Sequence, residues 1–401
     1  MSHVADGIAW RDPKRLWWPL ALAVPTLPWQ AGALVHLTGV TAFWWWGPFF
    51  AFVLVPLFDL ITGADGKNPP EAVVERLEQD RYYRWCTYLY LPLQFASLVW
   101  ACTQWSGGSL GIVGSIGLAA TTGVVAGVAI NTAHELGHKR EQVERRLSRL
   151  ALAQSGYGHF YVEHNHGHHV RVATPEDPAS SRMGESFWAF LPRTVVGSLG
   201  SAWSLERRRL QRRGRRTWSR HNDVLSAWAL SVAVFAALST AFGLVVLPYL
   251  LLQAALGIGL LESVNYLEHY GLLRRRRPDG RYERVAPRHS WNSNNTVSNL
   301  FLFQLQRHSD HHANPLRRYQ TLRHFDEAPQ LPAGYAAMIV LAWVPPLWRR
   351  VMDRRLLAHY DGDVSLANTR KPGAWLMASR RNASGPVREH RAATNQRSST
   401  R

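Results

Sequence analysis

Residues 221–273 read HNDVLSAWALSVAVFAALSTAFGLVVLPYLLLQAALGIGLLESVNYLEHYGLL, a long run without a single lysine or arginine. Residues 16–66 and 85–138 lack them as well, and all 46 lysines and arginines fall in the remaining stretches. A helix needs roughly 20 apolar residues to cross a bilayer, so each window has room for two spans and a turn. We therefore predict an all-α integral membrane protein with six transmembrane helices, at residues 16–36, 41–62, 85–105, 110–131, 224–242 and 245–265.

The distribution of charge also predicts the orientation of these helices. The turns of the three predicted hairpins, around Leu37–Val40, Gln104–Ser109 and Phe242–Val245, carry no positive charge. Every basic residue then lies on the opposite side of the membrane, which the positive-inside rule identifies as cytoplasmic, together with both termini. Membrane topology accounts for the formal net charge of +18 better than nucleic-acid binding does, because the charge is not spread along the chain.

These features divide the chain into six segments. They are a cytoplasmic N-terminal arm (1–15), transmembrane helices 1–4 (16–133), a cytoplasmic histidine-motif region (134–223), transmembrane helices 5 and 6 (224–267), a cytoplasmic histidine-motif region with a helical cap (268–385) and a disordered basic tail (386–401). The two cysteines, Cys86 and Cys102, fall in predicted spans and give neither a disulfide framework nor a CxxC pair.

Three further local patterns have structural interpretations. Gly123 and Gly127 have the GxxxG spacing of a tight helix-packing seam. The basic block Arg207–Arg216 suits either a membrane surface of anionic lipid or an acidic partner protein, and the sequence alone does not decide between them. The quartet Arg274–Arg277 follows the last predicted span and is first of all an anchor of the topology.

Histidines form four tight clusters at the predicted cytoplasmic ends of the spans. The clusters are His134-Glu135-Leu136-Gly137-His138, Glu163-His164-Asn165-His166-Gly167-His168-His169, Glu268-His269 and His308-Ser309-Asp310-His311-His312. On a helix, residues four apart lie on one face, so pairs such as His134 and His138 can share a metal ion. Four clusters at one membrane face predict a metal site carried by the cytoplasmic cap.

Nine of these imidazoles are candidate metal ligands: His134, His138, His164, His168, His169, His269, His308, His311 and His312. Nine ligands exceed the needs of one ion and suit two, although imidazole alone does not select among iron, copper, zinc and nickel. Each cluster also holds an acid that can accept a hydrogen bond from a ligand imidazole: Glu135, Glu163, Glu268 and Asp310. We expect His159 and His166 not to be ligands and His289 to be structural.

Two other classes of protein fit part of the pattern. Residues 134–138 match HExxH, the signature of zinc proteases in which the glutamate is the general base. A protease needs only one or two further ligands, whereas this chain offers seven. A histidine-lined metal transporter would place its ligands near the middle of the membrane, whereas here they lie at the ends of the spans.

The four motifs HELGHK (134–139), EHNHGHH (163–169), NYLEHYG (265–271) and LQRHSDHH (305–312) resemble the signatures of the bacterial membrane-bound alkane 1-monooxygenases. The resemblance extends from about Asn68 to about Tyr335. The eight-histidine pattern is shared with fatty-acid desaturases and hydroxylases that act on other lipids. The combination of NYLEHYG with LQRHSDHH is more specific for alkane hydroxylation.

The resemblance implies a function and a set of partners. The nine histidines would bind two non-haem iron ions, ferrous when reduced, and the four acids would not be primary ligands. The enzyme would use O2 and two electrons to hydroxylate the terminal methyl group of a medium-chain n-alkane, at the bacterial inner membrane. Its electrons would come from a separate rubredoxin with an NADH-dependent reductase, because the chain has no CxxC pairs. Residues such as Phe49, Phe50, Ala51, Phe52 and Leu54 would line the alkane channel or face lipid.

Overall fold

Helices make up nearly all of the regular structure in the computed structural model, which describes residues 10–370. Within these residues there is no strand, only isolated bridges such as Ala64 with Asn295, which confirms the all-α prediction. Five helical stretches are long and apolar enough to cross a membrane: Trp18–Thr38, Thr41–Thr62, Gly111–Gly137, Asp223–Phe242 and Leu244–Glu268. The predicted tail at 386–401 and most of the predicted N-terminal arm lie outside the described residues.

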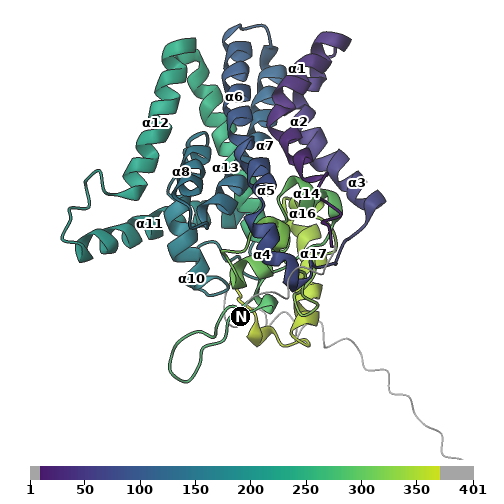
Figure 1. Cartoon of the computed structure of the whole chain (residues 1–401), viewed down its shortest axis with the longest axis vertical. Coiled ribbons are helices and arrows are strands. Elements are labelled where there is room, and N and C mark those ends of the chain that lie inside the picture. Colours follow the sequence, from purple (N-terminus) through teal and green to yellow (C-terminus); the bar gives the residue numbers. More distant parts are fainter. Residues whose placement is uncertain (1–9, 371–401) are drawn as a thin grey trace, which may run out of the picture.

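The long helices stand side by side in the upper part of the molecule (Figure 1). They are built from η1 (Trp18–Thr26), α1 (Leu27–Thr38), η2 (Thr41–Trp45), α2 (Trp46–Phe49), η3 (Phe50–Leu54), α3 (Val55–Thr62), α5 (Arg81–Tyr88), α6 (Tyr90–Ser106), α7 (Gly111–Gly137), α12 (Asp223–Phe242), η5 (Leu244–Val246) and α13 (Leu247–Glu268). The mainly polar part below holds α4 (Glu71–Gln79), α10 (His169–Arg171) and the helices that follow α13 (Figure 1).

The third predicted span, 85–105, is divided in the structure into α5 and the 17-residue α6. Pro92 explains the break, because it has no N–H to bond the carbonyl of Tyr88, where α5 ends. Helix α6 still stands beside α7 (Figure 1). A sixth membrane crossing at this place therefore stays a prediction.

Helices α7 and α13 form the centre of the bundle, and glycine allows their close contact. A Cβ atom on Gly123 would lie 2.7 Å from Cβ of Leu256, and one on Gly127 would lie 3.0 Å from Cβ of Leu260. The predicted GxxxG seam is therefore a packing contact. Both helices end at the same level, which places the first and third histidine motifs side by side.

The remaining helices surround these two ends. They are α4 (Glu71–Gln79), α8 (Gln142–Ala153), α9 (Phe160–Glu163), η4 (His164–His168), α10 (His169–Arg171), α11 (Phe187–Arg212), η6 (Pro287–His289), α14 (Thr296–Phe301), α15 (His308–Ala313), η7 (Tyr319–Thr321), α16 (Tyr335–Ala342), α17 (Pro345–His359) and η8 (Val364–Leu366). Helix α11 runs sideways below α12 and projects from the body (Figure 1). A fully buried Arg307 fastens α15 by donating to the carbonyls of Asp65, Lys67 and Leu322.

Candidate metal centre

The first histidine motif lies at the end of α7, where His134 is in the last turn and His138 caps the helix. Glu135, between them, does not face the other histidines. It forms an ion pair with Lys139 at 3.0 Å and accepts the N–H of Tyr319 at 3.2 Å. A general base of the HExxH type must face the metal, so this arrangement argues against the protease alternative.

The second motif is wound as a π-helix, η4, and not as the α-helix that its spacing suggests. A π turn bonds residues five apart, so His164 and His169 face each other with their Nε2 atoms 3.0 Å apart. His168 turns away from His164 towards a different set of histidines. Gly167 permits this winding, because a Cβ atom there would collide with the carboxylate of Glu163.

The third and fourth motifs complete the cluster from α13 and α15. His269 follows the last residue of α13, and its Nδ1 lies 3.3 Å from the carbonyl oxygen of His289. On α15, Nε2 of His312 lies 2.8 Å from Nε2 of His308. The third histidine of α15, His311, faces His134 instead, with 2.8 Å between the Nε2 atoms.

All nine candidate histidines come together, in two groups whose ligand atoms lie within 4.8 Å of one another. The first group is His134, His138, His164, His169 and His311, and the second is His168, His269, His308 and His312. The second group is entirely buried, whereas His138 and His169 of the first are half-buried. His166 is exposed and belongs to neither group, and His159 is buried against Tyr157, with ring centroids 4.4 Å apart.

Burial and mutual repulsion favour the neutral form of seven of these imidazoles. Burial lowers the pKa of His269 to about 3, and burial with the repulsion of neighbouring rings holds the pKa well below its usual range in His138, His164, His169, His308, His311 and His312. A neutral imidazole has a lone pair to give to a metal. The Nε2 atoms of His138 and His168 are buried and have no hydrogen-bond partner within residues 10–370. The donor set therefore fits two transition-metal ions.

The comparisons with known proteins agree with the four motifs. The model of the fatty acid desaturase family matches residues 111–342, which include all nine candidate ligands. The chain is 50% identical to alkane 1-monooxygenase of Acinetobacter baylyi over 80% of this chain and 79% of that protein. It is 47% identical to alkane 1-monooxygenase 1 of Alcanivorax borkumensis over 90% and 89%, and 46% identical to alkane 1-monooxygenase of Pseudomonas putida over 88% of each. The chain belongs to the alkane 1-monooxygenase family.

The acids that this alkane 1-monooxygenase homologue places near its histidines have different partners. Glu268 lies closest to the cluster, with Oε2 3.1 Å from Nε2 of His308. Asp310 binds Arg323 at 3.0 Å, and Glu163 binds Arg171 at 2.7 Å. Among the described residues neither Asp310, Glu163 nor Glu135 contacts a candidate ligand through a hydrogen bond, so their predicted role stays a prediction.

Asp177 is a site residue that the sequence analysis missed. Its Oδ2 lies 2.8 Å from Nδ1 of His168 and also accepts a hydrogen bond from the hydroxyl of Ser180 at 2.6 Å. Because the carboxylate is held by these donors, its pKa lies below the usual range despite its burial. The residue is nine positions from His168 in a loop, and no helical periodicity connects the two.

Two adjoining cavities reach the cluster from the side of the long helices. The inner cavity, of about 10 Å³, is lined by His134, His164, His308 and Glu268. The outer cavity, of about 100 Å³, shares Asn131, Leu261, Val264 and Leu305 with the inner one. Only Asn131 and Ser298 among its lining residues are polar. Of the predicted channel residues, Phe50, Ala51 and Phe52 line it, whereas Phe49 and Leu54 do not.

Proposed function

We propose that this protein is a membrane di-iron monooxygenase that converts medium-chain n-alkanes to 1-alkanols. Relatives named alkane 1-monooxygenase support the reaction class. The observation that carries the proposal is the junction of two groups of clustered imidazoles with an apolar cavity. The overall reaction is RCH3 + O2 + 2 e⁻ + 2 H⁺ → RCH2OH + H2O. An alkane offers no polar group for acid–base or nucleophilic catalysis, so a redox centre is required.

The nine histidines would hold two iron ions, five ligands for one and four for the other. The ions, ferrous when reduced, would supply the reduction of O2 and the oxidising power for a C–H bond. The protein's own residues fix the ligands. Asp177 accepts from Nδ1 of His168, and the carbonyl of His289 lies beside Nδ1 of His269. Such contacts would leave Nε2 of each ring to bind a metal ion.

The outer cavity would bind the alkane and exclude water. Its lining offers dispersion contacts from Phe50, Phe52 and Phe301 but only two polar side chains. The alkane would be positioned by the shape of the cavity. Leu261, Val264 and Leu305 line both cavities and would direct one end of the alkane towards the histidines. A dry site also protects the oxidant from side reactions.

The electrons would come from a separate rubredoxin with its NADH-dependent reductase. With two cysteines, Cys86 and Cys102, the chain has no CxxC pair for an iron–sulfur centre of its own. The basic residues and the metal centre would face the cytoplasm from the bacterial inner membrane.

A single preparation tests this function. The purified protein should contain two iron ions per chain and convert n-octane to 1-octanol only with O2, rubredoxin and its reductase. A preparation that contains zinc in place of iron, or no metal, would contradict the metal assignment. Oxidation of a fatty acyl substrate with no turnover of alkane would favour the alternative, a related desaturase or hydroxylase that acts on another lipid.

A further inference from the structure

Seven exposed arginines are crowded onto the end of α11 and the turn that follows it. They are Arg207, Arg208, Arg212, Arg213, Arg215, Arg216 and Arg220, and we call residues 207–220 the arginine hairpin. The nearby acids are already occupied, because Glu206 pairs with Arg209, and Asp223 pairs with Arg149 and Arg209. None of the seven forms an ion pair with another residue of the described chain. Their charge is therefore available to an anionic partner.

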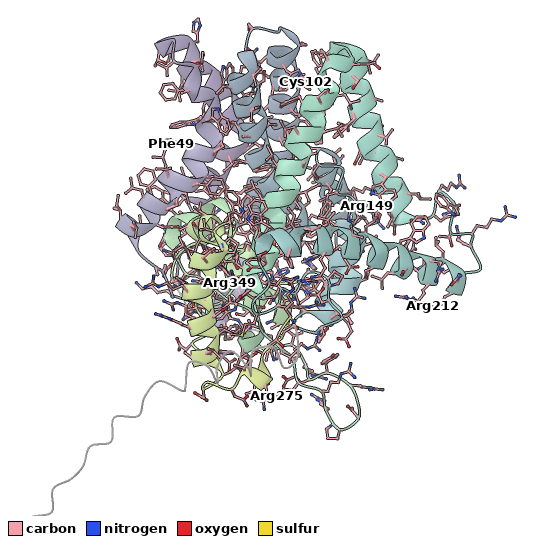
Figure 2. The ribbon with its side chains drawn as sticks, turned by 180° about the vertical axis from the view of Figure 1, so that it is seen from behind. Phe49, Cys102, Arg149, Arg212, Arg275 and Arg349 are labelled. Atoms are coloured by element: carbon pink, nitrogen blue, oxygen red, sulfur yellow. The ribbon has the colours of Figure 1, made fainter. Side chains whose placement is uncertain are left out.

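The arginine hairpin lies at the base of an apolar span. Two residues, His221 and Asn222, separate Arg220 from α12, which begins at Asp223 and is apolar enough to cross a membrane. Figure 1 shows α11 running sideways to this point and α12 rising from it. Figure 2 shows Arg212 at the outer end of α11, away from the body of the protein. Arginines at such a place lie level with lipid headgroups.

Aromatic and aliphatic side chains accompany the charges. Trp218, inside the hairpin, is 76% exposed, and its ring lies 5.0 Å from that of Trp203. Along α11 the exposed side chains continue with Val196 and Trp188. Trp188 lines an apolar cavity together with Trp45 and Leu256 of the long helices, so this exposed edge of α11 continues the lipid-facing surface. Tryptophan favours the boundary between hydrocarbon and headgroups.

The outer end of the hairpin lies away from the metal centre. The hydroxyl of Ser201 accepts a hydrogen bond from Arg171, which ends α10, two residues after the second histidine motif. Arg212 is eleven residues further along α11, which amounts to about 16 Å at 1.5 Å per residue. An electron carrier seated on the outer end of the hairpin, at Arg212, would be separated from Ser201 by that length of helix. The position favours lipid over a redox partner.

We propose that the arginine hairpin binds the phosphate groups of anionic phospholipids, with Trp203 and Trp218 seated among the acyl chains beside it. Bidentate contacts between guanidinium and phosphate groups attract the lipid headgroups. Because the aromatic rings lie among the acyl chains, the hairpin binds phospholipid in a bilayer rather than free phosphate. This binding is independent of the reaction catalysed at the histidine cluster.

The test compares lipid retention by two variants of equal charge. The full-length protein is reconstituted in an equimolar mixture of phosphatidylcholine and phosphatidylglycerol and repurified in detergent, and the retained lipids are measured by mass spectrometry. The hairpin variant carries Arg212→Gln, Arg213→Gln, Arg215→Gln and Arg216→Gln. The control variant carries Arg275→Gln, Arg277→Gln, Arg281→Gln and Arg284→Gln, four exposed arginines of the loop at the lower end of the molecule.

Wild type and control should retain phosphatidylglycerol in preference to phosphatidylcholine, and the hairpin variant should lose this preference by about tenfold or more. An unchanged preference in the hairpin variant, or no preference in wild type, overturns the proposal. Displacement of the lipid by an equal concentration of inorganic phosphate overturns it as well, because the site would then recognise the free ion. A raised KM for rubredoxin with unchanged lipid retention would assign the hairpin to protein docking.

Discussion

Asp177 accepts a hydrogen bond from Nδ1 of His168 at 2.8 Å, and both side chains are buried. A carboxylate can only accept here, so Nδ1 of His168 carries a proton and Nε2 is the ring atom left to bind a metal. Ser180 donates to the same oxygen of Asp177. The pair therefore fixes both the tautomer and the direction of one ligand in the four-histidine group.

Replacing this carboxylate should weaken the metal site without abolishing it. We expect Asp177→Ala to lower iron affinity about 10-fold to 100-fold, because His168 loses its orientation and part of its basicity. Competition with a chelator measures the effect. Glu176→Gln is the matched control, since Glu176 binds Arg276 and Tyr282 on the surface. Equal iron retention by both variants would contradict this role for Asp177.

The ligand histidines should be indispensable, and His166 should not be. His138→Ala removes a member of the five-histidine group, and His269→Ala removes a member of the four-histidine group. Each should lower iron content by roughly one equivalent or more and abolish hydroxylation, because an open coordination position exposes the ion to exchange. Elemental analysis by mass spectrometry gives the iron content. His168→Ala and His312→Ala should behave in the same way.

His166→Ala provides the control for that series. Its imidazole is exposed and lies outside both groups, so iron content should equal that of wild type. Loss of iron in this variant would show that the winding of the second motif differs in the metal-bound protein. Full iron and activity in any two of the four ligand variants would contradict the assignment.

The helices and the nine candidate histidines could be predicted from the sequence. The division of these histidines into a group of five and a group of four could not. Windows without lysine or arginine mark the spans because a charged residue is costly in the bilayer, and Thr41–Thr62 begins and ends where expected. The i, i+4 spacing of His164 and His168 does not predict this division, because η4 is a π turn. It places His164 beside His169, and His168 belongs to the other group. Asp177 reaches His168 through a loop, and a contact of that kind has no periodic signal.

The break between α5 and α6 shows a similar limit. Hydropathy averages over a window, so it merges residues 85–105 into one span. A proline acts on one hydrogen bond, and Pro92 ends α5 at Tyr88. Local backbone chemistry therefore decides details that composition cannot show.

The metal-free protein should lose stability as pH falls. In the unfolded chain histidine titrates near pH 6.5, whereas burial lowers the pKa of His269 to about 3. Between these values the unfolded state binds more protons than the folded state, so the free energy of unfolding decreases from about pH 7.5 to about pH 5.5. Thermal unfolding of the metal-free protein in detergent measures the decrease. His269→Ala should reduce this pH dependence, and a Tm that does not change with pH would contradict the argument.

The outer cavity should set the length of alkane that the enzyme accepts. Ala51 lines this cavity, whereas Val53 is 47% exposed on the outer side of the same helical segment. Ala51→Phe would fill space that the distal end of a long chain needs, so kcat/KM should fall at least tenfold for long n-alkanes and little for short ones. Val53→Phe adds similar volume on the lipid-facing side and should leave the chain-length profile unchanged. Gas chromatography of the 1-alkanols formed from a series of n-alkanes gives both profiles. If Ala51→Phe slows all chain lengths equally while iron content is normal, the cavity does not hold the alkane.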